Sequence, residues 1–403
     1  MDRNQFVAMN KIPIAIYLQH YLAPSMTFIY RQLKKAEEKY NPLVICSDRV
    51  ENRTKFPFDK LFLKRRNFIR AKKSRFYNKL FGSHTLLSIN PQISSGQSKY
   101  FSEILNKYQV KLIHAHFGPS GLEIVNLAKM NRIPLLVTFH GYDASILLKY
   151  QTYTENLKKL FTYAHIIAVS EEMKHKLVEI GANPDRISVV RCGIPMDVFK
   201  FTERTNLDQK IKEKKVINYL QVSNFVEKKG HAYTIEAFSL LLKKNPNSHL
   251  TLAGGGELYH KINQLVKEKN LSDHVTFTGV INEEKVKNLM NEADVFVHHS
   301  VTSKRGDREG VPTVLMEAMA TGLPVISTFH SGIPELINDG INGFLVKERD
   351  IESYSEKMHE ILSVGTKFSS NARKKVIGKF NLTKEVSHIM DIYKNLIDGK
   401  DRI

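Results

Sequence analysis

The chain has 403 residues, enough for two or three domains that each bury a core. Hydrophobic residues make up 42% and charged residues 25%, which excludes a disordered chain and a fibrous repeat. The net charge is +19, with 31 basic and 15 acidic residues among the first 200 and 29 and 26 among the rest, so the first half is predicted to present an anion-binding surface.

Strands and helices alternate along the first half of the chain. We predict strands over 11–18, 42–46, 111–114, 134–139, 166–169 and 187–191, and helices over 27–39, 121–130 and 171–180. No window approaches the roughly 18 consecutive apolar residues of a membrane span. The two cysteines, Cys46 and Cys192, lie far apart and have no disulfide or metal-binding spacing, which indicates a reducing cytoplasm.

The alternation starts afresh after a polar stretch over 202–215. Strands are predicted over 216–222, 249–253, 275–278, 295–298, 324–327 and 344–346, and helices over 231–243, 259–269, 283–291, 312–320 and much of 350–403. This pattern favours an α/β protein of two Rossmann-like domains with doubly wound parallel sheets, facing a central cleft. We expect the domains to span 1–200 and 201–385, with a C-terminal helix over 386–403 packing back on the first.

Two glutamates flank the start of the predicted helix at 312–320. Glu309 lies in the preceding loop and Glu317 within the helix, with Gly310 allowing close approach of a ligand to the backbone. Free N–H groups at a helix start favour anions or sugar hydroxyls, and a carboxylate can bind both hydroxyls of a ribose. Spacing alone does not distinguish such a binding site from a surface helix with two unrelated glutamates.

The segment from Glu309 to Glu317 resembles the E-x7-E signature of retaining glycosyltransferases of the family-4 type, which have the GT-B fold. The resemblance extends over about residues 110–350. The chain also resembles bacterial enzymes of the colanic-acid and amylovoran type in particular, which have a Ser-x-Thr-Phe-Ile element near the N-terminus. The segments that carry it include Ser25-Met-Thr-Phe-Ile29, Thr138-Phe-His-Gly141, Leu252-Ala-Gly254, Phe277-Thr-Gly279, Gly322-Leu-Pro-Val-Ile-Ser-Thr328 and Ser331-Gly-Ile-Pro-Glu335.

The resemblance implies a role for individual residues of the second half. Glu317 would bind the ribose of the donor nucleotide, Glu309 would contact the transferred sugar, and Lys229 would neutralise the diphosphate. The family usually has Gly-Arg where this chain has Ser223-Asn224, so the second cationic contact is open between Lys304, Arg305 and Arg308. Backbone near Val280 and Ile281 would face the base of the donor nucleotide. Further donor contacts are implied at Gly310, Val311, Pro312, Gly254 and Ser25.

Histidines follow two predicted strands of the first half. His140 stands where the family has its active-site histidine, so the resemblance implies contact with the donor sugar near the reacting carbons. His116 is the next candidate, and Asp143 would orient His140 or meet the acceptor; we interpret His114 as a packed histidine. No third ligand accompanies the H-x-H pair and no Asp-x-Asp occurs in the chain, so we expect neither a metal nor another cofactor.

The strongest cationic cluster runs from Lys60 to Lys79, with nine basic residues, no acidic residue and interleaved aromatics. It indicates an interfacial amphipathic segment that binds an anionic membrane surface, although a solvated helix face has the same composition. No recognition motif supports nucleic-acid binding, the other cationic interpretation.

The resemblance implies a retaining, metal-independent glycosyltransferase. It would transfer a sugar from a nucleotide diphosphate-sugar to a saccharide or lipid-linked acceptor during synthesis of a surface polysaccharide or lipopolysaccharide. We expect a cytoplasmic enzyme, peripheral at the inner face of the plasma membrane. The alternatives are a glucan synthase or phosphorylase-like GT-B enzyme and, in another class, a basic nucleic-acid-binding protein.

Overall fold

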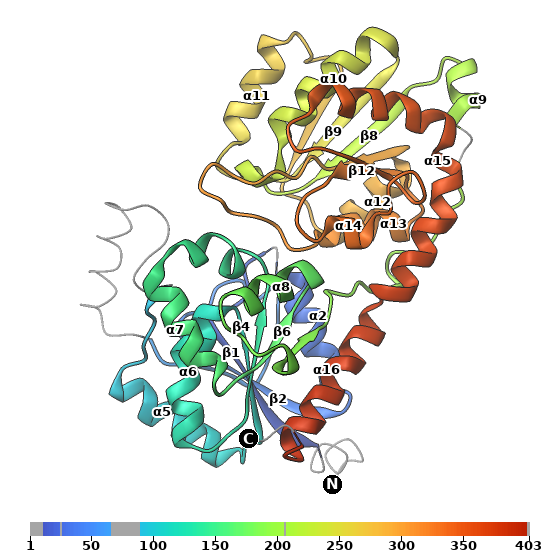
Figure 1. Ribbon diagram of the computed structural model, residues 1–403. Helices are drawn as coiled ribbons and strands as arrows, with labels where there is room; N and C mark the ends of the chain where they lie inside the picture. Colours follow the sequence, from blue (N-terminus) through green and yellow to red (C-terminus); the bar gives the residue numbers. More distant parts are fainter. Residues whose placement is uncertain (1–10, 25, 66–88, 205–206, 401–403) are drawn as a thin grey trace. The chain divides into compact units, whose positions relative to one another are not determined.

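The computed structural model describes residues 11–24, 26–65, 89–204 and 207–400 (Figure 1). The chain forms two compact units. The first unit comprises Met1–Arg191 and Leu382–Ile403, and the second unit comprises Cys192–Asn381. The boundaries therefore lie at 191 and 381 instead of the expected 200 and 385. The N–H of Ile194 donates to the carbonyl of Phe380 at 3.0 Å, which attaches the segment after residue 191 to the second unit.

The first unit contains a seven-stranded parallel sheet in the order β3-β2-β1-β4-β5-β6-β7. Its strands are β1 (Ile12–His20), β2 (Tyr40–Arg49), β3 (Leu61–Leu63), β4 (Leu112–His116), β5 (Leu135–Phe139), β6 (His165–Ala168) and β7 (Ile187–Val189). Because β3 pairs with β2, the first residues of the cationic cluster belong to the sheet and are not part of an amphipathic helix. Residues 66–79 of that cluster lie outside the described residues.

Helices connect these strands. They are α2 (Thr27–Ala36), α5 (Ser95–Lys107), α6 (Gly118–Met130), α7 (Gln151–Phe161) and α8 (Glu171–Glu179), with short 3-10 turns η1 (Tyr142–Ala144), η2 (Ile146–Lys149) and η3 (Pro184–Arg186). Neither α5 nor α7 was predicted from the sequence. Ser94 caps α5 by accepting from the N–H of Gln97, whose side chain bonds back to the N–H of Ser94, so a capping box was present in the sequence.

The last helix, α16 (Leu382–Ile397), belongs to the first unit and packs beside α2 (Figure 1). One face of α16 packs into the hydrophobic core formed by β1, β2 and α2. The buried residues of α16 recur every three or four positions, as expected for a stripe along one face of a helix. The buried residues of this stripe are Leu382, Val386, Ile389, Met390, Tyr393 and Leu396. The first unit thus takes part of its core from the end of the chain.

The second unit contains a six-stranded parallel sheet in the order β10-β9-β8-β11-β12-β13. Its strands are β8 (Ile217–Val222), β9 (Ser248–Ala253), β10 (Val275–Gly279), β11 (Val295–Val297), β12 (Val325–Thr328) and β13 (Phe344–Val346). Its helices are α9 (Leu207–Lys212), η4 (Glu227–Lys229), α10 (His231–Lys244), α11 (Tyr259–Glu268), α12 (Glu283–Glu292), α13 (Thr313–Ala320), α14 (Ile333–Leu336) and α15 (Ile351–Lys379).

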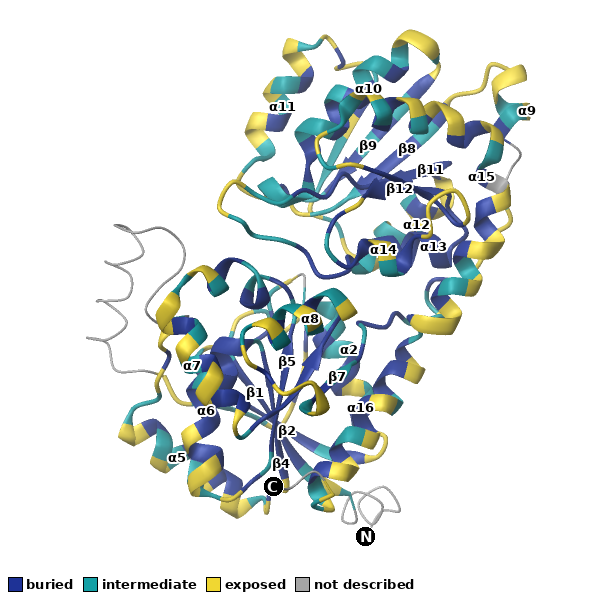
Figure 2. Ribbon diagram, in the orientation of Figure 1, coloured by how far each residue is buried: buried dark blue, intermediate teal, exposed yellow. Residues whose placement is uncertain are grey.

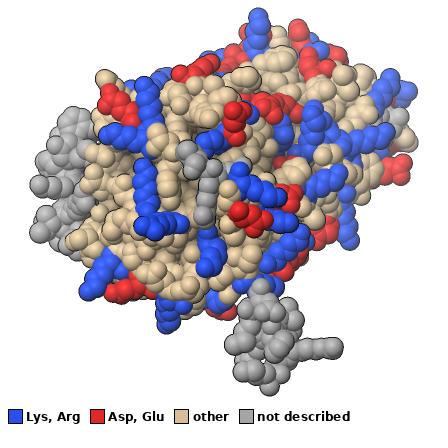
Figure 3. All heavy atoms as spheres, turned by 60° about the horizontal axis from the view of Figure 1, so that its bottom comes forward, with Lys and Arg blue, Asp and Glu red and all other residues tan. Residues whose placement is uncertain are grey.

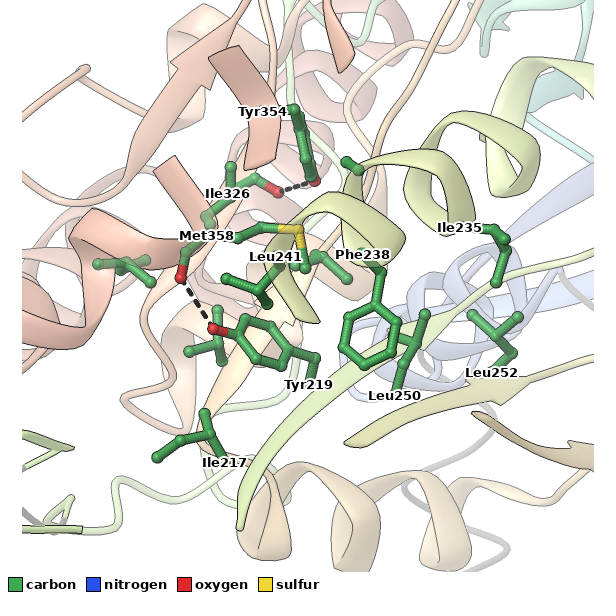
Figure 4. Packing of buried hydrophobic residues seen from close by; sticks show 14 of the residues in the cluster. Ile217, Tyr219, Ile235, Phe238, Leu241, Leu250, Leu252, Ile326, Tyr354 and Met358 are labelled. Carbon is green, nitrogen blue, oxygen red and sulfur yellow. Dashed lines mark hydrogen bonds between the residues drawn. The ribbon is translucent and has the colours of Figure 1, made fainter. Parts of the chain in front are cut away.

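Both sheets are buried between their helices (Figure 2). In the second unit α10 and α15 share one core with β8, β9 and β12, and two buried tyrosines anchor it (Figure 4). The hydroxyl of Tyr219 donates to the carbonyl of Met358 at 2.8 Å, and that of Tyr354 donates to the carbonyl of Ile326 at 2.9 Å. These bonds satisfy the only polar atom of each ring and fix α15 against the sheet.

The strand order reverses once in each sheet, between β1 and β4 and between β8 and β11. In doubly wound sheets, ligands bind outside the carboxyl ends of the strands at such a reversal. His116 is the last residue of β4, and His140 directly follows β5. Lys229 lies in the segment after β8, and Glu309 lies in the segment after β11. Each unit therefore presents sequence-predicted residues at the edge of its sheet where a ligand site is expected.

Candidate active site

Two loops of the second unit lie in direct contact after β8 and β11. The N–H of Val301 donates to the carbonyl of Lys228 at 3.0 Å. Gly230 has φ +63°, and a Cβ there would lie 1.8 Å from the carbonyl oxygen of His299. Only glycine fits this position, and the contact holds η4 against the start of the loop that carries Glu309.

Lys229 and Glu309 form a buried ion pair. The Lys229 ammonium lies 2.7 Å from both carboxylate oxygens of Glu309, and the Glu309 side chain is 8% exposed. Burial alone would raise the pKa of Glu309, but Lys229, then Lys228 and His298, outweigh it and lower the pKa to about 2. At neutral pH the pair is therefore a charged carboxylate and an ammonium with little solvent around them.

A second ion pair lies beside the first. Lys228 lies 3.0 Å from a carboxylate oxygen of Asp307, in the turn that precedes Glu309. Asn224, where the family has arginine, is exposed. The backbone N–H of Lys304 donates to the side chain of Glu227 at 2.9 Å. Lys228 was not among the residues predicted to supply a second cation, although it adjoins Lys229 in the sequence.

A histidine and a carboxylate support the backbone of Glu309. The N–H of Glu309 donates to Nε2 of His330 at 3.1 Å, and Nδ1 of His330 lies 2.6 Å from Glu348. Glu348 also accepts from the backbone N–H of Thr302 at 2.8 Å. Neither His330 nor Glu348 was predicted from the sequence, because they follow β12 and β13 and no spacing links them to Glu309.

The start of α13 presents backbone donors next to this ion pair. Pro312 caps the helix, which begins at Thr313, one residue later than predicted. In the part of the chain that the structure describes, no hydrogen bond occupies the N–H groups of Gly310 and Val311. Glu317, 8% exposed, lies on the second turn of the same helix. These donors and carboxylates can bind an anionic group together with hydroxyls.

Three residues predicted to contact the donor, Gly254, Val280 and Ile281, follow the neighbouring strands β9 and β10. Gly254, with φ +142°, follows β9, and a Cβ there would lie 2.0 Å from the carbonyl oxygen of Ser223. The N–H of Gly254 donates to the carbonyl of Gly279 at 2.9 Å, which places β9 and β10 together at this edge. Val280 is 79% exposed and Ile281 is half-buried, so Val280 offers an open apolar surface.

A buried histidine with no hydrogen-bond partner among the described residues lies at the end of β11. His298 directly follows β11 and is fully buried, and neither of its ring nitrogens has a hydrogen-bond partner among the described residues. Burial, and then the charge of Lys229, lower the pKa of His298 well below its ordinary value, so the ring is neutral. Such unpaired buried groups are costly unless a ligand completes them.

In the first unit, His116 and His140 interact at the ends of β4 and β5. Nδ1 of His116 lies 3.0 Å from Nε2 of His140, and the rings are stacked with centroids 5.3 Å apart. Phe28 and Phe117 contact the His140 ring at 5.0 and 4.7 Å between centroids. Burial lowers the pKa of His116 to about 3 and that of His140 well below its ordinary value, so both rings are neutral at pH 7.

Phe117 has φ +74° and ψ 142°, a combination that is rare outside glycine and costs on the order of 1–3 kcal/mol. The strained residue directly follows His116, and its ring lies against His140. Phe28 belongs to the Ser-x-Thr-Phe-Ile element, which therefore reaches His140 through its phenylalanine. Ser25 of that element lies outside the described residues.

Asp143 lies beneath the histidine loop. Its fully buried carboxylate accepts from the N–H groups of His140, Gly141 and Gly118 at 3.0, 2.9 and 2.9 Å. Burial raises the pKa of Asp143, and these three bonds oppose the rise. The carboxylate therefore fixes the backbone of His140 and is not exposed to an acceptor.

His114 is packed, as the sequence indicated. Its Nδ1 lies 2.7 Å from the hydroxyl of Tyr393 on α16, and its Nε2 lies 2.7 Å from the hydroxyl of Thr138. The His114 ring contacts that of His116 with centroids 4.4 Å apart. The C-terminal helix thus touches the row of histidines that ends at His140.

Basic and acidic side chains are interspersed on the face that Figure 3 shows. Lys60, Lys64 and Arg65, the described basic residues of the cationic cluster, are all exposed. None of the helices that the structure describes is long and apolar enough to span a bilayer. No group of three or more metal-ligating side chains occurs within the described ranges.

Two sequence families match this chain. Residues 203–376 match the family described as Glycosyl transferases group 1, and residues 69–198 match Glycosyltransferase Family 4. The chain belongs to the group 1 glycosyltransferases with the GT-B fold, and it is an enzyme of that class. The predicted family and fold are thereby confirmed.

Relatives of known name support this assignment. The chain is 31% identical over 288 residues to the putative colanic acid biosynthesis glycosyltransferase WcaL of Salmonella typhimurium, covering 70% of this chain and 69% of that protein. It is 31% identical over 276 residues to the amylovoran biosynthesis glycosyltransferase AmsK of Erwinia amylovora, covering 68% and 65%. It is 25% identical over 317 residues to the Escherichia coli UDP-Gal:alpha-D-GlcNAc-diphosphoundecaprenol alpha-1,3-galactosyltransferase, covering 74% and 79%.

Solved structures show the same fold at low identity. Anabaena Alr3699/HepE in complex with UDP has a TM-score of 0.74 and 17% identity, covering 95% of this chain and 100% of that one. A glycosyltransferase from Rickettsia africae has a TM-score of 0.74 and 21% identity, covering 96% and 99%.

Proposed function

We propose that this enzyme is a retaining, metal-independent glycosyltransferase. It transfers a sugar from a nucleoside diphosphate-sugar to a saccharide or lipid-linked acceptor in surface-polysaccharide synthesis. The observation that carries the proposal is the buried Lys229–Glu309 pair beside the open N–H groups of Gly310 and Val311. A cation, a carboxylate and backbone donors at one helix start match the charges and hydroxyls of such a donor.

On donor binding, the diphosphate competes with Glu309 for the ammonium of Lys229. The released Glu309 carboxylate accepts hydrogen bonds from hydroxyls of the transferred sugar. The diphosphate next to that sugar binds the N–H groups at the start of α13. Glu317 binds the ribose hydroxyls, and the base lies along the exposed Val280 and half-buried Ile281. Lysine supplies the positive charge that a metal supplies in other transferases.

In the transfer step, the bond between the anomeric carbon and the β-phosphate oxygen breaks. The acceptor hydroxyl forms the new bond on the face from which the diphosphate departs, so the anomeric configuration is retained. The acceptor proton passes to the departing phosphate oxygen, which gains the bonding electron pair. The protein contributes placement and charge stabilisation, with Lys229 near the developing negative charge.

His140 contacts the transferred sugar as a neutral hydrogen-bonding group. Its pKa lies well below its ordinary value, so it is not an acid at neutral pH. His116 bonds to its Nε2, and Asp143 holds its backbone. The name of the Escherichia coli relative specifies a UDP-sugar and a diphosphate-linked lipid acceptor, which makes these the first candidates here. We propose that the enzyme acts at the inner face of the membrane.

The test begins with binding. Full-length enzyme is titrated with UDP, GDP and their sugars in a thermal-shift panel, in which a ligand at 100 times its Kd adds about 2.7 kcal/mol of stability. Lys229→Met should abolish the shift, and Lys244→Met, an exposed lysine at the end of α10, should preserve it. Oligonucleotide binding with no response to any nucleotide-sugar would refute the proposal.

Turnover is then measured with the donor so identified and a lipid-linked acceptor. We expect release of the nucleoside diphosphate, a product with the donor's anomeric configuration by NMR, and full activity in EDTA. Orthophosphate consumption would indicate a phosphorylase. An inverted product would refute retention, and a strict Mg²⁺ or Mn²⁺ requirement would refute metal independence.

A further inference from the structure

The loop that carries Glu309 is fixed at both ends by one carboxylate–imidazole unit. At its start, the N–H and hydroxyl of Thr302 donate to Glu348 at 2.8 and 3.1 Å. At its end, the N–H of Glu309 donates to Nε2 of His330 at 3.1 Å. Nδ1 of His330 lies 2.6 Å from Glu348, so the two attachments are joined.

This geometry determines the tautomer of His330. Nε2 receives an N–H, so it must carry a lone pair and no proton. Nδ1 lies against a carboxylate, so it must carry the proton that it donates to Glu348. His330 is fully buried and its polar atoms are both used, which leaves the ring one orientation and one protonation state.

The fixed backbone N–H belongs to the residue that pairs with Lys229. The Glu309 carboxylate is held by Lys229 only until a donor diphosphate competes for that ammonium. The bond to His330 involves the Glu309 backbone and is independent of this competition. It therefore holds the peptide of Glu309 in place while the side chain changes partner.

We propose that His330, oriented by Glu348, is the positioning residue that keeps Glu309 in register with the transferred sugar. The proposal rests on the proposed function, in which Glu309 contacts that sugar. A displacement of about 1 Å in such a group can cost on the order of 100-fold in rate, so a hydrogen bond outside the ligand contacts can control turnover.

The proposal predicts sensitivity to acid. Protonation of Nε2 would place two N–H groups face to face and release the end of the loop. The charged and titratable groups that act on His330 are Glu348, Glu309, Arg308 and His298, with Arg349 bound to Glu348. Burial is the largest influence and lowers the pKa of His330, so the ring stays neutral at pH 7 and the loss occurs below.

Two substitutions separate the two bonds of the ring. A glutamine amide reaches the position of Nε2, so His330→Gln can still accept from the N–H of Glu309. An asparagine amide reaches the position of Nδ1, so His330→Asn can still donate to Glu348 but leaves Glu309 unsupported. His274→Asn is the matched control, because its Nδ1 bonds to the carbonyl of Ser248 at 3.0 Å in the same unit.

We expect His330→Asn to lower kcat about 100-fold with little change in nucleotide affinity, and His330→Gln to retain most of the turnover. His274→Asn should behave as the wild type. In a Glu309→Gln background, the His330→Asn loss should largely disappear, because the group that it positions is already gone. Equal losses in the Gln and Asn variants, or a loss that persists in the Glu309→Gln background, would overturn the proposal.

A measurement on the wild-type chain covers the case in which a variant fails to fold. Long-range proton–nitrogen spectra of the imidazoles, assigned through backbone-to-ring correlations in the wild type, should show His330 only as the Nδ1–H tautomer. An Nε2–H tautomer would overturn the proposal without any assay of activity. Full activity of Glu309→Gln would instead refute the proposed function, so the two failures are distinguishable.

Discussion

Replacing Lys229 by methionine tests the electrostatics of the second unit most directly. Methionine keeps much of the side-chain length and removes the charge that lies 2.7 Å from both oxygens of Glu309. The difference between the pKa of about 2 in the folded chain and the ordinary 4.5 corresponds to about 3 kcal/mol in favour of the charged carboxylate. Breaking a buried pair on one side costs a similar amount, about 3–5 kcal/mol.

The expected loss depends on pH, and its sign follows from the lowered pKa of Glu309. In the wild type, the contribution of Glu309 is fully present above about pH 4.5 and is lost as the pH falls towards 2. In Lys229→Met, the buried carboxylate of Glu309 has lost its ammonium partner. Its ionised form at neutral pH is therefore an unpaired charge, which burial destabilises. The deficit should therefore be about 3 kcal/mol at pH 7 and should shrink as the pH approaches 4.

The assay is urea unfolding of the full chain at several pH values, followed by far-ultraviolet circular dichroism because the chain has no tryptophan. Two units can unfold in separate transitions, so each transition is fitted by itself. The double variant Lys229→Met/Glu309→Gln should recover much of the loss, giving a coupling of about 2–3 kcal/mol. Lys228→Met, whose partner Asp307 is 30% exposed, should cost less than about 1 kcal/mol. A deficit below about 1 kcal/mol at pH 7, or one that does not change with pH, would refute the reasoning.

Three further expectations can be checked independently. Glu317→Ala should weaken nucleotide-sugar binding by about 1–3 kcal/mol in calorimetry, and unchanged affinity would exclude it from the donor site. Tyr393→Phe leaves Nδ1 of His114 without its partner and should cost about 1–3 kcal/mol of stability, whereas Tyr40→Phe, which frees only a backbone carbonyl, should cost less. The protein should sediment with phosphatidylglycerol vesicles and be released by salt, since each basic residue contributes on the order of 1 kcal/mol. A variant with serine at five basic positions should no longer sediment with the vesicles but should still bind nucleotide-sugar. The five positions are Lys64, Arg65, Arg66, Lys72 and Lys73.

The predictable part of the site is local in sequence. His140 directly follows β5, and Lys229 and Glu309 lie in the segments after β8 and β11. Ligands of doubly wound sheets bind at this edge, outside the carboxyl ends of the strands. The family resemblance assigned roles to them, and the confirmed family and fold agree with the βα alternation. The helix at Glu317 was predictable from Pro312 at its start and Gly322 beyond its end.

The missed part depends on contacts between distant segments. His330 and Glu348 meet Thr302 and Glu309 only because β11, β12 and β13 are neighbours in the sheet. The bond from Tyr393 to His114 spans 279 residues, and no periodicity predicts it. For Asp143, the sequence left open whether it orients His140 or meets the acceptor, because its three backbone partners are created by the turn that it stabilises.

The contribution of α16 to the first unit has a consequence for protein synthesis. Domains usually fold as they leave the ribosome, the N-terminal one first. Here the core around β1 and α2 lacks the apolar stripe of α16 until residues 382–397 have been made, by which time the whole second unit has been translated. The second unit can therefore fold before the first unit is complete. Until α16 has been made, the apolar faces of α2 and β1 that it covers are exposed and available to chaperones. A nonsense mutation near residue 381 would leave both residues of the Lys229–Glu309 pair in the chain. The first unit of the product would nevertheless lack the part of its hydrophobic core that α16 supplies.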